Sequence, residues 1–245
     1  MSATVTEAAA YVYGVTWADG ARERAEGGVA DAAVRVLEHG ELAALVSDLP
    51  SVDVRARRRD LLRHAVVLQQ AFEQSTVVPL GFGTVFATGD DVIEELLEPR
   101  YEELVALLQS LDGLVELTVR AFYDESLVLA AIVDDDPRIA ALRGSGAPGD
   151  QMLLGEAVAQ ALADRRSRDA DEVVAELSSH ARQVVVEERV AEFELVRAAF
   201  LVDRAAVPGL DRRAEELAER FGGIVRFKLT GPLPPHHFVS EQWAS

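Results

Sequence analysis

The sequence contains no cysteine among its 245 residues. Disulfide bonds, thiolate nucleophiles and cysteine-ligated zinc are therefore excluded. Positive charge is also scarce, because 24 Lys and Arg residues stand against 42 Asp and Glu residues, for a formal net charge of −18. A phosphate backbone is repelled by this average charge, so we expect no general binding to nucleic acid.

Long apolar runs are missing as well. No stretch approaches the ~20 uninterrupted apolar residues that a transmembrane helix needs. The first residues, MSATVTEAAAYVYG, lack the basic region and apolar core of a secretory signal. We therefore expect a cytoplasmic protein without a membrane partner. Hydrophobic residues make up 49 % and charged residues 27 %, which is the composition of a globular chain long enough for two domains.

The first part of the chain reads as strands followed by helices. Residues 11–17 alternate with period two, which predicts a strand with an aromatic face. Segments 33–38 and 41–48 flank His39 and Gly40, a pattern typical of a hairpin. Ser51 or Asp53 is expected to cap a helix whose buried stripe consists of Leu61, Ala65, Leu68 and Phe72.

The second part mixes strands and helices in the same way. Apolar and polar side chains alternate over residues 115–123, which predicts a strand. Residues 192–203 are apolar at both odd and even positions, as in a strand buried on both faces, and residues 225–229 are expected to form a final strand. Residues 156–207 contain neither Gly nor Pro and predict mainly helix, with a break expected in the charged run 164–172. The sequence near 143–150 reads as a flexible excursion, and 231–245 as a proline-rich tail.

This order of elements predicts an α+β protein with two domains, 1–112 and 113–245. The first is expected to be a modified ferredoxin-like fold. The second is expected to combine a smaller sheet with long helices.

The sequence contains no recognisable set of catalytic or metal-binding residues. The five histidines lack a recognisable ligand spacing, and the pair His236 and His237 reads as a polar surface tail. The acidic run 134–136 lacks the spaced ligands of a calcium loop. The glycine-rich segment 81–84 has neither a P-loop lysine nor a dinucleotide-binding frame. We predict no catalytic residue, cofactor or metal.

One basic cluster interrupts the acidic chain at the start of the first long helix. Cations at a helix N-terminus oppose the helix dipole, so an acidic surface that binds these arginines would explain their presence. The alternative is that the arginines form an ordinary solvated face of the helix. The candidate partner-binding residues are these arginines together with two aromatic residues that support the same region: Arg55, Arg57, Arg58, Arg59, Tyr13 and Phe82.

Three stretches resemble one known family when taken together. They are YVYGV at 11–15, VPLGFGTVF at 78–86, and LTGPLPPHHFV at 229–239, which follows AFLV at 199–202. Their order and spacing are similar to those of the gas vesicle protein F/L family (GvpF/GvpL), over essentially the whole chain. The family commonly has Arg where this chain has Gly81, and Trp and Tyr where it has Leu233 and His236.

The resemblance implies a non-enzymatic accessory protein of gas vesicle formation, with two α+β domains. Its implied partners are the small hydrophobic shell protein and other accessory proteins, during nucleation or assembly. Two other classes stay open. One is a ferredoxin-like small-molecule sensor or enzyme, for which His64 and His180 are the histidines that could be buried in a pocket. The other is a minor structural subunit of the vesicle wall.

Overall fold

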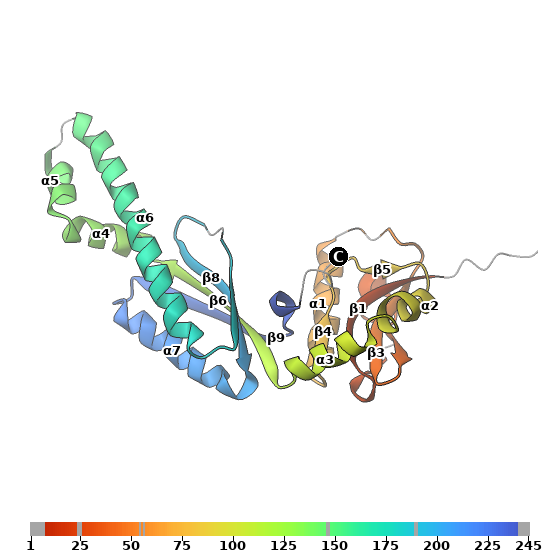
Figure 1. Ribbon diagram of the computed structural model, residues 1–245. Helices are drawn as coiled ribbons and strands as arrows, with labels where there is room; N and C mark the ends of the chain where they lie inside the picture. The colour runs from red at the N-terminus through yellow and green to blue at the C-terminus, as the bar shows by residue number, and fades with distance from the viewer. Residues whose placement is uncertain are drawn as a thin grey trace, which may run out of the picture. The chain divides into compact units, whose positions relative to one another are not determined.

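The computed structural model describes residues 8–23, 26–53, 55, 57–145, 148–188 and 191–239. The chain divides into two compact units (Figure 1). Unit 1 comprises Met1–Glu116 and Pro232–Ser245, and unit 2 comprises Leu117–Gly231. The division thus falls shortly after residue 112, and the C-terminal tail groups with the first unit.

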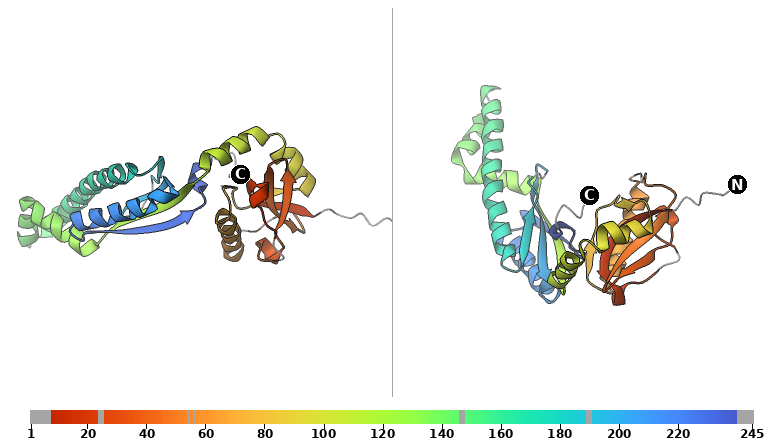
Figure 2. Two further views of the ribbon diagram at one scale, coloured as in Figure 1. Left: turned by 90° about the horizontal axis from the view of Figure 1, so that it is seen from below. Right: turned by 45° about the vertical axis from the view of Figure 1, so that its right-hand side comes forward.

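Unit 1 is built on a five-stranded sheet whose main path has the order β2-β3-β1-β4, with β5 also pairing with β1. Its strands are β1 (Ala9–Trp17), β2 (Arg35–His39), β3 (Leu42–Leu49), β4 (Val77–Pro79) and β5 (Val85–Phe86). Its helices are α1 (Arg58–Phe72), α2 (Gly89–Asp91), a π-helical segment (Val92–Leu97) and α3 (Tyr101–Leu111). Helix α1 lies on one side of the strands, and α2 and α3 lie on the other (Figure 2).

The strand order is that of a ferredoxin-like fold, with one modification. Where that fold has its first helix, between β1 and β2, this chain has an irregular segment with two short 3-10 turns, Ala18–Gly20 and Val29–Asp31. The hairpin predicted around Gly40 is confirmed, and Gly40 has a φ of 61°, which favours glycine. The α+β class and the modified ferredoxin-like fold are thus confirmed.

A β-bulge in β1 brings that strand close to α1. The pairing with β3 shifts register between Val12 and Gly14. A Cβ atom on Gly14 would lie 2.7 Å from the carbonyl oxygen of Val78 and 2.9 Å from Leu68 Cδ2 of α1. Glycine is therefore required here so that α1 can pack closely against the sheet.

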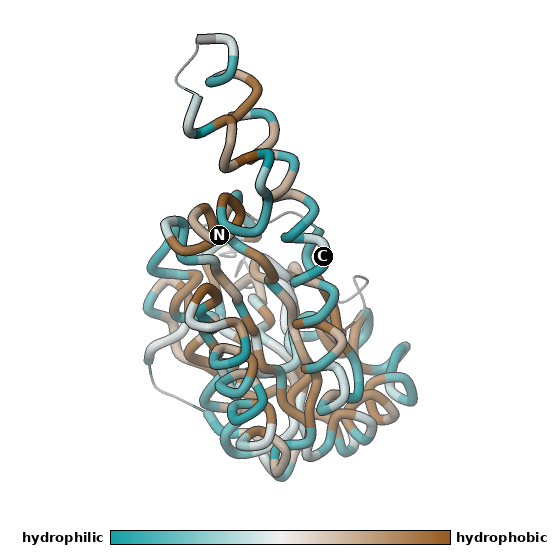
Figure 3. Tube along the Cα trace, turned by 90° about the vertical axis from the view of Figure 1, so that its left-hand side faces the viewer, coloured by the Kyte–Doolittle hydropathy of each residue, from teal (hydrophilic) through white to brown (hydrophobic). Residues whose placement is uncertain are grey.

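Unit 2 has the complete ferredoxin-like order, with the sheet β7-β8-β6-β9. Its strands are β6 (Leu114–Tyr123), β7 (Gln183–Val186), β8 (Glu194–Asp203) and β9 (Val225–Leu233). Its helices are α4 (Glu125–Asp135), α5 (Pro137–Ser145), α6 (Pro148–Ser178) and α7 (Val207–Arg220). Hydrophilic and hydrophobic residues alternate along α6 (Figure 3).

Helix α6 is continuous over 31 residues, so the break expected at 164–172 is wrong. The excursion predicted near 143–150 is helical up to Ser145 and again from Pro148, and its centre, 146–147, lies outside the described residues. No helix in the described part of the chain has both the length and the apolarity needed to cross a bilayer.

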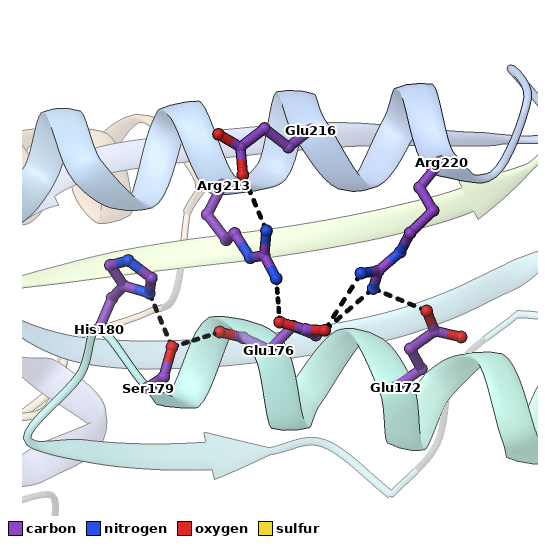
Figure 4. Close-up of polar contacts among 7 residues, drawn as sticks. All are labelled: Glu172, Glu176, Ser179, His180, Arg213, Glu216 and Arg220. Carbon is purple, nitrogen blue, oxygen red and sulfur yellow. Dashed lines mark hydrogen bonds and ion pairs between the residues drawn. The ribbon is translucent and has the colours of Figure 1, made fainter.

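Ion pairs join α6 to α7 on one face of the unit 2 sheet (Figure 4). Arg220 contacts Glu172 at 2.7 Å and Glu176 at 3.1 Å, and Arg213 contacts Glu176 and, at 2.8 Å, Glu216. The hydrogen bonds from Arg213 and Arg220 lower the pKa of the Glu176 carboxyl. These side chains are partly exposed, so the cluster orients the helices more than it stabilises them.

A carboxylate buried in unit 2 joins two strands. Glu194 of β8 is 1 % exposed and lies 2.6 Å from Arg120 Nε and 2.8 Å from Arg197 Nη2. Hydrogen bonds from Arg197 and Arg120 lower the pKa of Glu194 to about 2. This carboxylate therefore stays ionised and ties β6 to β8.

The C-terminal tail is held within unit 1. Glu116, 1 % exposed, accepts hydrogen bonds from the His237 backbone N–H at 2.9 Å and binds His237 Nδ1 at 2.8 Å. Gln69 of α1 donates to the Pro232 carbonyl at 3.3 Å. His237 is thus exposed, as expected of a polar surface tail, and in addition anchors the tail to Glu116.

Candidate functional site

Helix α1 has apolar side chains on two faces. Its buried face consists of Asp60, His64, Val67, Leu68 and Phe72. Leu68 and Phe72 were predicted correctly, but Leu61 is 43 % exposed and Ala65 is also exposed, so the predicted stripe is wrong by one residue at its start.

The outer face of α1 is unusually apolar for a surface helix. Leu62 is 58 % exposed and Val66 is 49 % exposed. These two residues are one helical turn apart and therefore neighbours on the surface. Together with Gly27, Arg58, Arg59 and Arg63 they line an open hollow of about 500 Å³. We call these six residues the α1 surface.

The arginine cluster lies at the beginning of α1. Arg57 is the N-cap residue, without a side-chain capping bond, and Arg58 and Arg59 follow in the first turn. Capping by Ser51 or Asp53 is thus wrong, because the helix begins several residues later. Each exposed cation at this end opposes the helix dipole by about 0.3–1 kcal/mol.

The four predicted arginines differ in their surroundings. All are exposed, and in the described residues no ion pair is found for Arg55, Arg57 or Arg58. Arg59 lies 3.9 Å from Asp31 and 3.7 Å from Asp60. The structure brings Arg58 and Arg59 to the same hollow as Leu62 and Val66, two residues that no sequence pattern singles out.

A strained turn supplies the carboxylate nearest to this surface. Asp31 forms an ion pair with Arg63, which lowers the pKa of the Asp31 carboxyl. Ala30 and Asp31 have φ angles of 56° and 64°, a region that non-glycine residues seldom occupy. The turn is held from beneath, because the Ala30 N–H donates to Asp60 Oδ1 at 3.2 Å and the Val29 N–H donates to Tyr13 Oη at 2.7 Å.

Tyr13 and Phe82 lie behind α1 and not on its outer face. Tyr13 is completely buried, so it offers a partner no atom to contact and could influence binding only by supporting the sheet. Phe82 is half-buried, with its ring centroid 5.8 Å from those of both Tyr11 and His64. Their role in partner binding stays a prediction.

His64 completes a directed chain of hydrogen bonds in this core. Its Nε2 atom lies 3.2 Å from the Leu80 carbonyl, which can only accept, so Nε2 carries the proton. Its Nδ1 atom, 2.8 Å from Tyr11 Oη, therefore accepts the tyrosine hydroxyl proton. Tyr11 Oη in turn accepts from the Gly83 N–H at 3.3 Å. Every polar atom of the imidazole is thus used when the ring is neutral.

The protonation state of His64 follows from its position. His64 is 6 % exposed, and burial, with a smaller contribution from nearby His236, lowers its pKa to about 4. Tyr13 has a similar arrangement, since it lies 2.8 Å from Ser47 Oγ and Ser47 donates to the Ala33 carbonyl at 2.7 Å. These side chains have structural partners, and none is directed into the hollow of the α1 surface.

The other histidine considered for catalysis, His180, lies in unit 2. It is exposed, and its Nδ1 is 2.9 Å from Ser179 Oγ (Figure 4). Within the described ranges, no three His, Asp or Glu side chains converge as a metal site.

The sequence motifs at 11–15 and 78–86 meet in the core behind α1. Gly14 pairs with Pro79, and Tyr11 pairs with Val85. The family model of the gas vesicle synthesis protein GvpL/GvpF matches residues 9–240, which is nearly the whole chain. This chain belongs to the GvpL/GvpF family. It is therefore an accessory protein of gas vesicle synthesis, and the predicted resemblance is confirmed.

Members of the family from distant organisms are similar over most of their length. Gas vesicle protein F of a Streptomyces species is 34 % identical over 238 residues, covering 94 % of this chain and 98 % of that protein. Gas vesicle protein L1 of Halobacterium salinarum is 31 % identical over 237 residues, covering 87 % and 83 % of the two chains.

Solved structures of the family share the fold. The crystal structure of GvpF from an Anabaena species superposes with a TM-score of 0.81 at 23 % identity, covering 96 % of this chain and 99 % of that one. GvpF from Microcystis aeruginosa gives a TM-score of 0.74 at 22 % identity, with 95 % and 99 % coverage.

Proposed function

We propose that this chain acts without catalysis, by binding the small hydrophobic shell protein and other accessory proteins while gas vesicles nucleate or assemble in the cytoplasm. The α1 surface is the contact region. The observation that carries this proposal is the combination of exposed Leu62 and Val66 with Arg58, for which no ion pair is found in the described residues.

Helix stability alone does not account for this surface. Exposed apolar side chains gain nothing in the free protein, and the arginines at the N-terminus of α1 act against the helix dipole. A partner that covers Leu62 and Val66 and presents carboxylates to Arg58 would offset both costs. The shell protein is apolar, so a partner must cover its exposed surface until it is assembled into the vesicle.

The absence of a catalytic role is supported by the way His64 is held. Its two nitrogens bind Tyr11 and Leu80, and its low pKa keeps it neutral near pH 7. A general acid or base needs a pKa near the working pH and access to a substrate. His64 has neither property.

Co-expression with the shell protein from the same genome tests the proposal. A tagged chain should capture the shell protein in stoichiometric amount. Arg57→Glu/Arg58→Glu should abolish most of the capture, because it reverses two exposed charges at the start of α1, one of them in the α1 surface. The matched control is Arg168→Glu/Arg212→Glu, which changes the net charge equally at two exposed arginines of unit 2 and should capture normally.

Equal capture by both double variants would contradict a role for the α1 surface. No capture by any folded version would contradict direct shell-protein binding. Washing purified vesicles distinguishes an assembly factor from a structural subunit of the vesicle wall. A wall subunit stays with the washed vesicles, whereas an assembly factor is removed.

A further inference from the structure

We propose that the α1 surface receives an acidic amphipathic helix, and that Asp31 holds the position of the partner's carboxylate until that helix arrives. The inference rests on the proposed function, because it names the chemistry of the partner at the same surface. It comes from the spacing of the α1 side chains and from the strained turn beside them.

The spacing on α1 fits a second helix. Arg59 and Arg63 are one turn apart on one edge of the hollow, and Leu62 and Val66 are one turn apart as well. Side chains four residues apart on a helix lie about 5–6 Å from one another. A helix with two carboxylates one turn apart, beside a row of apolar residues, therefore matches the cations and the apolar pair simultaneously.

Asp31 shows that this place accommodates a carboxylate. Its side chain is 64 % exposed, forms an ion pair with Arg63 and lies 3.9 Å from Arg59. An exposed pair of this kind is weak enough for an incoming carboxylate to replace it.

The backbone beneath Asp31 is suited to a change of position. Two successive non-glycine residues, Ala30 and Asp31, have positive φ angles, and such conformations persist only where neighbouring contacts enforce them. Release of Asp31 from Arg63 would let this turn relax. The anchors of the turn, Tyr13 and Asp60, lie beneath it and leave Asp31 itself exposed.

The charge distribution of unit 1 restricts an acidic partner to this surface. By sequence, unit 1 contains 9 Lys and Arg residues against 21 Asp and Glu residues, and five of the nine basic residues fall between Arg55 and Arg63. The rest of the unit repels an acidic helix. Complementary charge thus provides both attraction at the α1 surface and selection against other sites.

Fluorescence anisotropy with a designed probe tests the inference on the full chain. The probe is an Ala-rich helical peptide of about 18 residues with a leucine stripe and two Glu residues at i, i+4 beside it. A second peptide has Gln in place of each Glu. The Glu peptide should bind about tenfold more tightly than the Gln peptide, as expected for two exposed charge pairs.

Three protein variants locate the site. Asp31→Asn keeps a residue that tolerates positive φ but removes the competing charge, so it should bind the Glu peptide about two- to fivefold more tightly. Leu62→Ser/Val66→Ser should weaken the binding of both peptides. Arg168→Glu/Arg212→Glu in unit 2 should leave both affinities unchanged, and circular dichroism confirms that each variant is folded.

Equal affinity for the two peptides, or no gain in Asp31→Asn, would overturn the inference. If the shell protein is still captured in an Arg58-dependent way, the proposed function stands and only the partner's chemistry is wrong. If capture fails but the peptide binds with the expected order of affinities, the docking site stands and its natural partner is a different protein.

Discussion

Replacing His64 by glutamine should remove a specific part of the pH dependence of stability. The imidazole is buried and neutral, with a pKa of about 4, whereas a histidine in an unfolded chain titrates near pH 6.5. Between these values the unfolded chain binds a proton that the folded protein does not bind. Stability is therefore lost as the pH falls from about 6.5 toward about 4.

The size of this effect follows from the two pKa values. For a single group with pKa values of about 4 and about 6.5, lowering the pH from about 7.5 to about 5 decreases the free energy of unfolding by about 2 kcal/mol. The group is nearly fully buried, so solvent screening reduces the effect little. Glutamine offers a donor and an acceptor but cannot titrate.

Urea denaturation followed by tryptophan fluorescence measures the effect in unit 1, because residues 117–231 of unit 2 contain no tryptophan. His64→Gln should be less stable than the wild type at pH 7.5, since an amide cannot reach both Tyr11 and Leu80 equally well. The decisive quantity is the difference between the two pH values, which should be about 2 kcal/mol smaller in the variant.

The other titrating groups are present in both proteins. Carboxylates whose pKa values are lowered, such as Glu194, titrate at a lower pH, and their contribution is common to the two. An unchanged pH dependence in His64→Gln would refute the account of a neutral, fully bonded imidazole.

Three further substitutions test the packing and the charge of the fold. Gly14→Ala should destabilise unit 1 by about 2 kcal/mol or more in urea denaturation, because its Cβ would lie 2.7 Å from the Val78 carbonyl oxygen of β4 and 2.9 Å from Leu68 of α1; an unchanged midpoint would contradict the close approach of these two elements. Glu194→Gln should cost about 1–3 kcal/mol and lower the melting temperature, since Arg120 and Arg197 lose a buried carboxylate; near-neutral stability would mean that the pair is solvated. Arg58→Glu should instead raise the stability of unit 1 by about 0.3–1 kcal/mol at low salt, and a loss of stability would show that this arginine supports the fold.

The strands and turns of this protein were predictable where the pattern is local. The hairpin around Gly40 and the doubly buried strand β8 follow from alternation, apolar runs and turn chemistry. The face of α1 was less accessible. Asp60 and His64 are buried because Ala30 and Tyr11 supply their hydrogen bonds, and these partners are 30 and 53 residues away in the sequence. A prediction from the apolar pattern alone therefore places Leu61 on the buried face of α1, whereas this residue is exposed.

The candidate site was predictable only in part for the same reason. The arginines are visible as a charge cluster in the sequence. Leu62 and Val66 are ordinary helix residues until the opposite face of α1 is known to be buried. Asp31 joins them through a turn with positive φ angles at non-glycine residues, which no local rule predicts.

The most direct test of the account measures binding and folding on the same variants. Affinity for the co-purified shell protein and the melting temperature would be determined for the wild type, Arg58→Glu, and the unit 2 control Arg168→Glu. The account predicts that Arg58→Glu binds several-fold more weakly while its melting temperature is equal or higher, and that the control changes neither. Unchanged binding by Arg58→Glu, or a loss of binding that only accompanies unfolding, would contradict a docking role for the α1 surface.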